Sequence, residues 1–364
     1  MASVFFYISG HGFGHAARQI EAINAFGALD GGSTQIVIRT TAAQWLFDRT
    51  VRVPFTLLAD PVDTGIVQID SLRLDERATV HRANAFHATL VEKARQDAAV
   101  LRKHDARLVV VDAPPLGCAA AAAAGVPSVV CANFTWDWIY QGYDPPPDLI
   151  LRIQEAYRKA KAAWRLPMHG GFETFVNITD VPFIARHSTH PRDDVRRRLN
   201  LPLDVPLALS SFGGYGVRDL DIAMLDCLDL VGIVLTGRGD QATPSVPGVS
   251  FVDEAHLYGS GLRYEDLVSA VDVVVTKPGY GIIAECIANE TAMLYTSRGR
   301  FVEYDVLVRE MPRYLRCRYL PLEDLLAGRW REGLEELLPQ TPPPERPRTD
   351  GADVVARKIA DSWQ

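Results

Sequence analysis

The sequence lacks several features that would point to a function on their own. Its 364 residues contain no Walker A phosphate loop, no HExxH zinc motif and no CxxC pair. The five cysteines are odd in number and widely scattered, which predicts reduced thiols in a cytoplasmic protein. The longest apolar stretch, residues 116–130, is interrupted by Gly125 and Pro127 and is too short to be a transmembrane segment. No basic segment precedes an apolar core near residue 1, so we expect no secretory signal.

Positive charge is not in excess either. The chain has 38 Lys and Arg residues against 45 Asp and Glu residues, and its formal net charge is −7. This balance argues against a nucleic-acid partner, because such binding depends largely on neutralising phosphates. A small anionic ligand remains compatible, since it needs only a local site. The length and the 48% hydrophobic content indicate a globular protein of about two domains.

The chain does contain an alternation of strand-like and helix-like segments. Apolar runs that predict buried parallel strands cover residues 3–9, 34–40, 54–60, 107–115 and 127–134, and then 206–214, 232–237, 249–253, 272–279 and 292–297. Helical segments are expected between most of them, including a long one at 75–103 and an alanine-rich one at 116–124. This rhythm predicts an α/β fold with two Rossmann-like domains.

The predicted domains divide near a basic connector. We expect an N-terminal domain at residues 1–190, a C-terminal domain at 191–350, and a final helix at 351–364 that is a candidate for crossing back to the first domain. The connector contains four arginines that we expect on a solvated helix face: Arg192, Arg196, Arg197 and Arg198. Ligands of such folds bind outside the carboxyl ends of the strands.

The loop after the first strand, "SGHGFGHAAR", is the most informative segment. Its glycines have the spacing GxGxG instead of GxGxxG, and the second strand ends in Arg39 instead of an acidic residue, so a nicotinamide cofactor is poorly supported. His15 is the first candidate for a base that accepts a proton from a bound hydroxyl, and His11 is the second. The alternative is that these histidines only cap the helix or bond to loop carbonyls.

Two glycine-rich loops recur in the second half. "SFGGYG" includes Gly213 and Gly214, and "TKPGYGIIAE" combines Lys277 with a helix start that presents free backbone N–H groups to an anion. One turn into that helix, Glu285 either binds the two ribose hydroxyls of a nucleotide or faces solvent. After the fifth strand of this half, Arg298 and Glu303 lie at the same expected ligand edge.

Two further motifs are less specific. Asp219-Leu220-Asp221 has the DxD form of metal-dependent transferases, but it opens an expected helix, where acidic residues favour the helix dipole, so we predict no metal site. Trp136, in "NFTWDWIY", follows a strand end and either stacks on a sugar or acceptor or packs in the core.

Several segments together resemble a known family. "YISGHGFGHAARQIEAI", "NFTWDWIY", "VPFIARHSTHPRDDVRRRLNL", "SFGG" and "KPGYGIIAE" are similar, in this order, to the glycosyltransferase-like N-terminal domain of plant L-arabinokinases. The sugar-kinase half of those proteins has no counterpart here, so sugar kinase activity is not implied. More broadly, the pattern resembles the GT-B glycosyltransferases, which implies two Rossmann-like domains facing across a cleft.

The resemblance also implies a reaction. A sugar would move from a nucleoside diphosphate donor, in that superfamily typically UDP, to the hydroxyl of a small-molecule or glycan acceptor, without a metal or cofactor and with inversion. His15 would be the base. The implied donor-binding residues are Gly213, Gly214, Lys277, Gly279, Tyr280, Gly281, Glu285, Arg298 and Glu303, and the implied acceptor-binding residues are Gly12, Phe13, Asn133, Trp136 and Asp137. A nucleotide-sugar 2-epimerase or hydrolase, and a non-catalytic nucleotide-sugar-binding module, remain alternatives.

Overall fold

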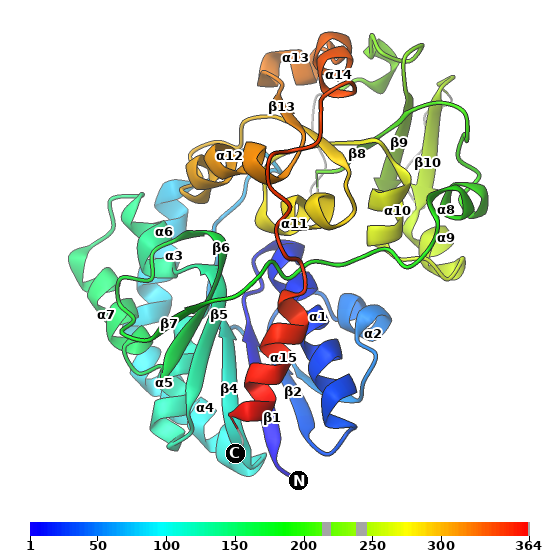
Figure 1. The fold of residues 1–364 in the computed structure, drawn as a ribbon. Helices are drawn as coiled ribbons and strands as arrows, with labels where there is room; N and C mark the ends of the chain where they lie inside the picture. Colours follow the sequence, from blue (N-terminus) through cyan, green and yellow to red (C-terminus); the bar gives the residue numbers. More distant parts are fainter. Residues whose placement is uncertain (213–219, 238–245, 363–364) are drawn as a thin grey trace.

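A computed structural model describes residues 1–212, 220–237 and 246–362 (Figure 1). Two parallel sheets organise this part of the chain, one in each lobe of the molecule. The predicted glycines 213 and 214 and the first aspartate of the DxD motif lie outside the described residues. None of the helices in the described ranges is long and apolar enough to cross a membrane.

The first sheet has seven strands in the order β3-β2-β1-β4-β5-β6-β7. These strands are β1 (Ser3–Ile8), β2 (Gln35–Arg39), β3 (Phe55–Leu58), β4 (Ala106–Asp112), β5 (Ser128–Phe134), β6 (Ala162–Gly170) and β7 (Ile178–Asp180). The accompanying helices are α1 (Gly12–Asp30), α2 (Gln44–Thr50), α3 (Glu76–Ala88), α4 (Leu90–Lys103), α5 (Pro115–Ala124), α6 (Trp136–Gln141) and α7 (Pro147–Tyr157).

The second sheet has six strands in the order β10-β9-β8-β11-β12-β13. They are β8 (Leu207–Ser210), β9 (Gly232–Gly237), β10 (Val249–Asp253), β11 (Val273–Thr276), β12 (Ala292–Tyr295) and β13 (Cys317–Tyr319). The helices of this part are α8 (Arg192–Arg198), the short 3-10 helix η2 (Ile222–Met224), α9 (Glu254–Gly259), α10 (Tyr264–Ala270), α11 (Tyr280–Ala288), α12 (Glu303–Tyr314), α13 (Leu322–Leu326) and α14 (Arg331–Leu337). The prediction of two Rossmann-like α/β units is confirmed.

The central strand β1 shows why its sequence is continuously apolar. Val4, Phe6 and Ile8 point into the core on the α1 side, whereas Phe5 and Tyr7 point into a second core beneath α4 and α5. Because helices cover both faces, alternation between apolar and polar residues is lost, as in other buried parallel strands. The carboxyl ends of β1, β4 and β5 therefore meet at one edge of this sheet.

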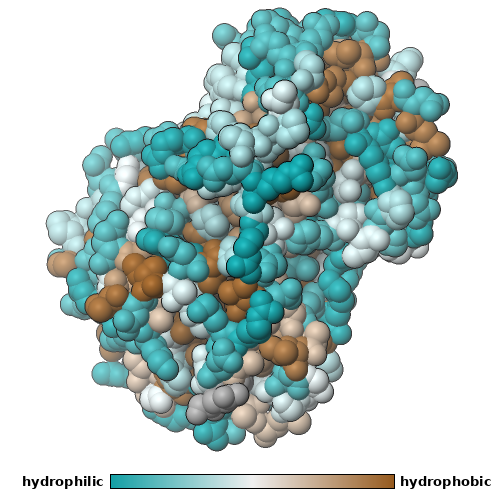
Figure 2. Space-filling model, in the orientation of Figure 1, coloured by the Kyte–Doolittle hydropathy of each residue, from teal (hydrophilic) through white to brown (hydrophobic). Residues whose placement is uncertain are grey.

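The end of the chain lies beside its beginning. After the second sheet, α15 (Gly351–Asp361) packs along α1 and buries Val355 and Ile359 against the first lobe. Figure 1 shows this helix, in red, beside α1, in blue. The chain thus passes between the lobes twice, through residues 181–191 and again through the segment before α15. Figure 2 shows the two lobes as a space-filling surface with polar side chains over most of the visible face.

Some elements differ from the sequence prediction. The single helix expected at 75–103 is two helices that meet at Thr89. The strands β6, β7 and β13 were not predicted: β6 includes Pro167, and β7 and β13 have only three residues each. Arg196 was wrongly placed on a solvated face, because its buried guanidinium donates to the carbonyl of Ala270 at 2.7 Å and to Asp272 at 2.9 Å.

Candidate active site

The predicted base His15 lies in a buried ion-paired cluster at the carboxyl edge of the first sheet. It occupies the first turn of α1, which starts at Gly12 in the left-handed region, with φ of 71°. Its Nδ1 is 2.9 Å from Oδ1 of Asp112, the last residue of β4. A carboxylate at this distance favours the tautomer in which Nδ1 carries the proton, so Nε2 keeps a lone pair and can accept a proton.

Asp112 is held in its ionised form by Arg18. Burial alone would raise the pKa of this carboxyl, but the attraction of Arg18 and His15 outweighs it and lowers the pKa to about 2. Arg18, one turn after His15, donates from Nε to Oδ2 at 2.6 Å and from a terminal nitrogen to Oδ1 at 2.5 Å. Both side chains are almost completely buried, so this bidentate pair fixes the carboxylate in one orientation.

The same cluster reaches the second lobe. The other terminal nitrogen of Arg18 donates to Oδ1 of Asn133 at 2.6 Å, and Nδ2 of Asn133 donates to Oε1 of Glu303 at 2.6 Å. Glu303 is the first residue of α12 and is buried. The sequence assigned Asn133 to the acceptor and Glu303 to the donor sugar, and the structure places these two side chains in direct contact.

His11 lies beside this cluster but in different surroundings. Its Nδ1 accepts a hydrogen bond from the Ile66 N–H at 3.3 Å, and its ring stacks on Phe301 with the centroids 6.1 Å apart. Burial, together with the positive charges of Arg298, His15 and Lys277, holds the pKa of His11 well below its usual value. His11 is therefore a neutral ring at pH 7, and its Nδ1 is already occupied.

The expected acceptor residues do not form one surface. Trp136 is fully buried, stacks on Tyr140 and donates from Nε1 to Asp63 at 2.8 Å, which matches the core-packing alternative. Asp137 is buried as well and accepts from Gln154 and Thr174, each at 3.3 Å. Phe13, adjacent to Gly12, is 40% exposed, and its ring lies 5.8 Å from that of Trp45 on α2.

The predicted phosphate loop of the second lobe packs directly against the glycine loop of the first. Helix α11 begins at Tyr280 after Gly279, and its first turn contains no acidic residue. A Cβ added at Gly281 would come within 3.1 Å of the Gly14 Cα, which explains why glycine suits both positions. Tyr280 is buried, and its ring carries the Arg18 guanidinium 5.1 Å from its centroid.

Two cations border this helix start. Burial and the neighbouring Arg298 lower the pKa of the Lys277 ammonium to about 7, and burial lowers the pKa of Arg298. Lys277 donates to the Ser71 carbonyl at 2.5 Å, while the Arg298 guanidinium lies 3.9 Å from the centroid of Phe301. Within the described ranges, neither cation forms an ion pair with a carboxylate. Buried positive charge without a carboxylate partner favours binding of an anion.

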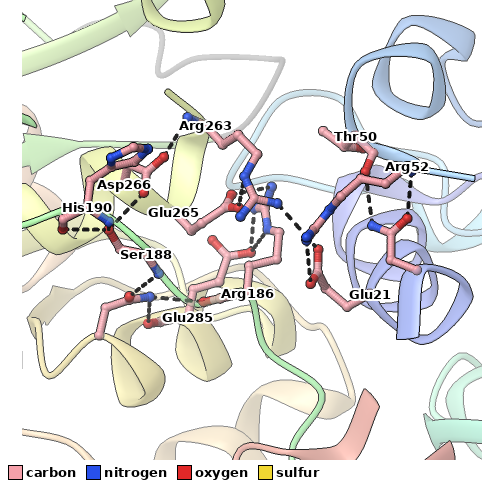
Figure 3. Close-up of polar contacts among 12 residues, drawn as sticks. Glu21, Thr50, Arg52, Arg186, Ser188, His190, Arg263, Glu265, Asp266 and Glu285 are labelled. Atoms are coloured by element: carbon pink, nitrogen blue, oxygen red, sulfur yellow. Dashed lines mark hydrogen bonds and ion pairs between the residues drawn. The ribbon is translucent and has the colours of Figure 1, made fainter. Parts of the chain in front are cut away.

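Glu285 is buried instead of solvent-facing and already has a cationic partner. Arg186, in the connector, donates from Nε to Glu285 Oε1 at 2.7 Å and places a second nitrogen against the same oxygen. Burial raises the pKa of Glu285 to about 6 despite this arginine. Figure 3 shows the guanidinium groups of Arg186 and Arg263 between the carboxylates of Glu285, Glu265 and Glu21.

A cavity of about 790 Å³ lies on the other side of Glu21. It is bordered by α1, by the connector around His187 and by the segment before α15. It does not include His15, Asp112 or Lys277, so it is separate from the site formed by the glycine loops. No group of three or more His, Cys, Asp or Glu side chains is arranged to hold a metal ion within the described ranges.

Asp112, Arg18, Ser71 and Arg186 were not singled out in the sequence. A signal was present for Asp112, which ends an apolar run at the expected ligand edge. Arg18 follows His15 by three residues and therefore shares its helix face, a second usable signal. Arg186 and Ser71 lie in irregular segments, where sequence periodicity carries no information about contacts.

Comparison with known proteins adds to this geometry. No family model matches the sequence. The chain is 27% identical to an L-arabinokinase of Arabidopsis thaliana over 351 residues, which are 93% of this chain but 32% of that protein. It is 24% identical over 283 residues to a protein of Methanopyrus kandleri described as an uncharacterized glycosyltransferase, covering 72% of this chain and 78% of that protein. The chain thus spans about a third of the length of the arabinokinase.

Solved structures extend the likeness to the whole fold. The glycosyltransferase of kitacinnamycin superposes with a TM-score of 0.63 at 14% identity, covering 99% of this chain and 97% of that one. Phytolacca americana UGT2, solved with UDP-2-fluoro-glucose and pterostilbene, superposes with a TM-score of 0.60 at 12% identity, covering 99% and 94%. The chain therefore has the two-domain GT-B fold of glycosyltransferases, and nearly all of its sequence is similar to part of an L-arabinokinase.

Proposed function

We propose that this protein is a glycosyltransferase that moves a sugar from a nucleoside diphosphate donor to an acceptor hydroxyl. The observation that supports this most is the juxtaposition of a histidine–carboxylate pair with a cationic helix start. His15 and Asp112 lie on one lobe, Lys277 lies on the other, and the adjoining loops touch at Gly14 and Gly281. A proton acceptor beside an anion site suits attack on a donor whose leaving group is a diphosphate.

In the proposed reaction, Nε2 of His15 removes the proton from the acceptor hydroxyl. The hydroxyl oxygen forms a bond to the anomeric carbon from the face opposite the diphosphate, and the bond from that carbon to the diphosphate oxygen breaks. The configuration is inverted, and the nucleoside diphosphate leaves with the electron pair. Asp112 stabilises the imidazolium that forms, because its carboxylate stays ionised.

The leaving diphosphate is proposed to lie at the start of α11. The free N–H groups of its first turn, Lys277 and Arg298 supply positive charge there, which is the role that a divalent metal has in other transferases. Oε1 of Glu285 is bound by Arg186, whereas Oε2 has no hydrogen-bond partner among the described residues. We assign the ribose hydroxyls to Oε2.

The nucleotide is proposed to be UDP, on the likeness to a structure that contains UDP-2-fluoro-glucose. Residues 1–190 would form the acceptor domain and residues 191–350 the donor domain. Gly213 and Gly214 complete the diphosphate site in this proposal, and Glu303 holds a hydroxyl of the donor sugar. Its hydrogen bond with Asn133 places it within reach of the base cluster.

The first test is binding. Unfolding is measured with a panel of nucleoside diphosphates and nucleotide sugars, and a ligand at 100 times its Kd should stabilise the fold by about 2.7 kcal/mol. If no member of the panel stabilises the protein, the proposal fails.

The second test separates transfer from its alternatives. The protein is incubated with the bound nucleotide sugar alone and then with candidate acceptors. Conversion of the donor without an acceptor indicates an epimerase or hydrolase, and binding without any conversion indicates a non-catalytic module. His15→Ala should lower turnover about 10²- to 10⁴-fold, whereas the exposed His81→Ala should leave it unchanged.

A further inference from the structure

A hairpin of the first lobe is seated on the second lobe. Residues 66–76 connect β3 to α3 and turn back on themselves through the antiparallel bridge between Gln68 and Leu74. The Asp70 carboxylate stabilises the turn by accepting from the N–H groups of Leu72 and Arg73, each at 2.8 Å. The base of the hairpin is fixed to the first lobe, where the Val67 N–H donates to the Thr79 hydroxyl at 3.0 Å.

The tip of this hairpin contacts the second lobe through two adjacent residues. The Ser71 hydroxyl donates to the Phe212 carbonyl at 2.6 Å, and the Ser71 carbonyl accepts from Lys277 Nζ at 2.5 Å. Leu72 is 8% exposed and packs in the apolar core beneath β8 and β11 of the second lobe, against residues that include Phe212. Outside the tip, the ion pair of Arg300 with Glu76 at 3.2 Å is a further link.

These contacts lie where the donor is expected. Phe212 immediately precedes the two glycines assigned to the diphosphate, and Lys277 is the cation assigned to it. A carbonyl oxygen is a neutral partner for a largely buried ammonium, whereas a phosphate oxygen carries negative charge and forms the stronger, charge-assisted hydrogen bond. Ser71 therefore occupies Lys277 with a weaker partner than the proposed ligand.

We propose that the hairpin 66–76 is a plug on the donor site, which holds Lys277 through Ser71 in the ligand-free protein and leaves it when a nucleoside diphosphate binds. This inference rests on the proposed function, because it requires the donor diphosphate to bind at Lys277. It predicts that the hairpin and the nucleotide compete. The apparent Kd of the nucleotide is then the intrinsic Kd divided by the fraction of molecules in which the hairpin is undocked.

Weakening the docked hairpin should therefore tighten nucleotide binding. Ser71→Ala removes the hydroxyl bond to Phe212, and a hydrogen bond is worth a factor of about 2 to 10 in such an equilibrium. Leu72→Ala removes the apolar anchor and should lower the Kd by about tenfold or more. Ile69→Ala is the matched control, because Ile69 belongs to the same hairpin and its side chain is 53% exposed.

The measurement is isothermal calorimetry of UDP, and separately of dTDP, with the wild type and the three variants. The expected result is a lower Kd for Ser71→Ala and Leu72→Ala and an unchanged Kd for Ile69→Ala. An equal or higher Kd in both tip variants overturns the plug while leaving the proposed function intact. If neither nucleotide binds any of the four proteins, the proposed function fails and the plug fails with it.

A second measurement uses the wild type alone and does not depend on how the variants fold. Trypsin cuts after Arg73 in the hairpin and after Arg95 on α4, whose side chain is 71% exposed. Saturating UDP should accelerate cleavage after Arg73, although bound ligands ordinarily protect a protein, and should leave cleavage after Arg95 unchanged. Cleavage after Arg73 that is unchanged or slower with bound UDP contradicts the plug.

Discussion

Replacing Arg186 by methionine tests the buried ion pair on which the predicted ribose site depends. The Arg186 guanidinium lies between Glu285, at 2.7 Å, and Glu265, at 3.5 Å, and it stacks 5.4 Å from the centroid of the Tyr264 ring. Methionine keeps an unbranched apolar stem but removes the charge. The buried Glu285 carboxylate then loses the partner that forms its ion pair.

The magnitude follows from the burial of the pair. Removing one partner of a buried ion pair typically costs about 3–5 kcal/mol, because the other charge is left desolvated and uncompensated. Both side chains are nearly inaccessible, at 11% for Arg186 and 5% for Glu285, so solvent screening reduces this cost little. We expect Arg186→Met to lower the free energy of unfolding by about 3–5 kcal/mol at pH 8.

The loss should shrink in acid. Burial raises the pKa of Glu285 from 4.5 to about 6 even with Arg186 present, and without the arginine the pKa rises further. Because the folded-state pKa lies above the unfolded value, the folded protein binds the proton first as the pH falls. The folded variant therefore gains stability between that raised pKa and pH 4.5, and this gain is absent at pH 8.

Urea unfolding at pH 8 and pH 5 of the wild type, Arg186→Met, Glu285→Gln and the double variant measures these effects. The double variant should recover most of the loss of Arg186→Met, with a coupling energy of at least about 2 kcal/mol. Glu285→Gln alone controls for the loss of the carboxylate. Additive costs, or an equal loss for Arg186→Met at both pH values, would falsify the assignment of a strong buried pair.

Three further predictions concern other groups. Lys277→Met should raise the Kd of UDP at least about tenfold by calorimetry, because a charge-assisted contact is lost, and an unchanged Kd would place the diphosphate elsewhere. Asp112→Asn should lower turnover at least about 10²-fold while leaving the UDP Kd within twofold, because it disturbs the base and not the donor, and a matched fall in affinity would contradict this separation. Burial and the nearby Arg152 lower the pKa of His87 from 6.5 to about 3, so the unfolded chain binds the proton first and stability falls as the pH drops from 6.5 to 3, by up to about 5 kcal/mol. His87→Phe should flatten that part of the pH dependence of thermal unfolding, and an equally steep loss in the variant would show that other groups cause it.

The sequence supports the fold and the loop positions well because those signals are local. An apolar run followed by glycines marks a strand and its ligand edge, and this pattern correctly predicted α1 and α11 after their loops. The helix at 75–103 was predicted as one element because its composition does not reveal the break at Thr89. Short edge strands such as β13 depend on pairing with a neighbour and leave almost no pattern of their own.

The partners of the site residues are a different matter, because they come from distant parts of the chain. Asp112 follows His15 by 97 residues, and Glu285 follows Arg186 by 99. A single sequence shows that a histidine stands in an open loop but not which carboxylate orients it. It likewise shows a glutamate on a helix but not that an arginine from the connector already holds one of its oxygens. Both facts depend on the packing of the two lobes.

The orientation of the base is coupled to the docking of the second lobe. Arg18 must face Asp112 because that buried carboxylate needs a cation, and its remaining nitrogen then fixes Oδ1 of Asn133. With that oxygen engaged, Nδ2 of the same amide points to Glu303 on the second lobe. A change at Glu303, whether a donor sugar arrives or the lobes separate, therefore alters the last partner in a continuous chain of hydrogen bonds that ends at His15. This arrangement gives the base its final set of contacts only when both lobes are in place.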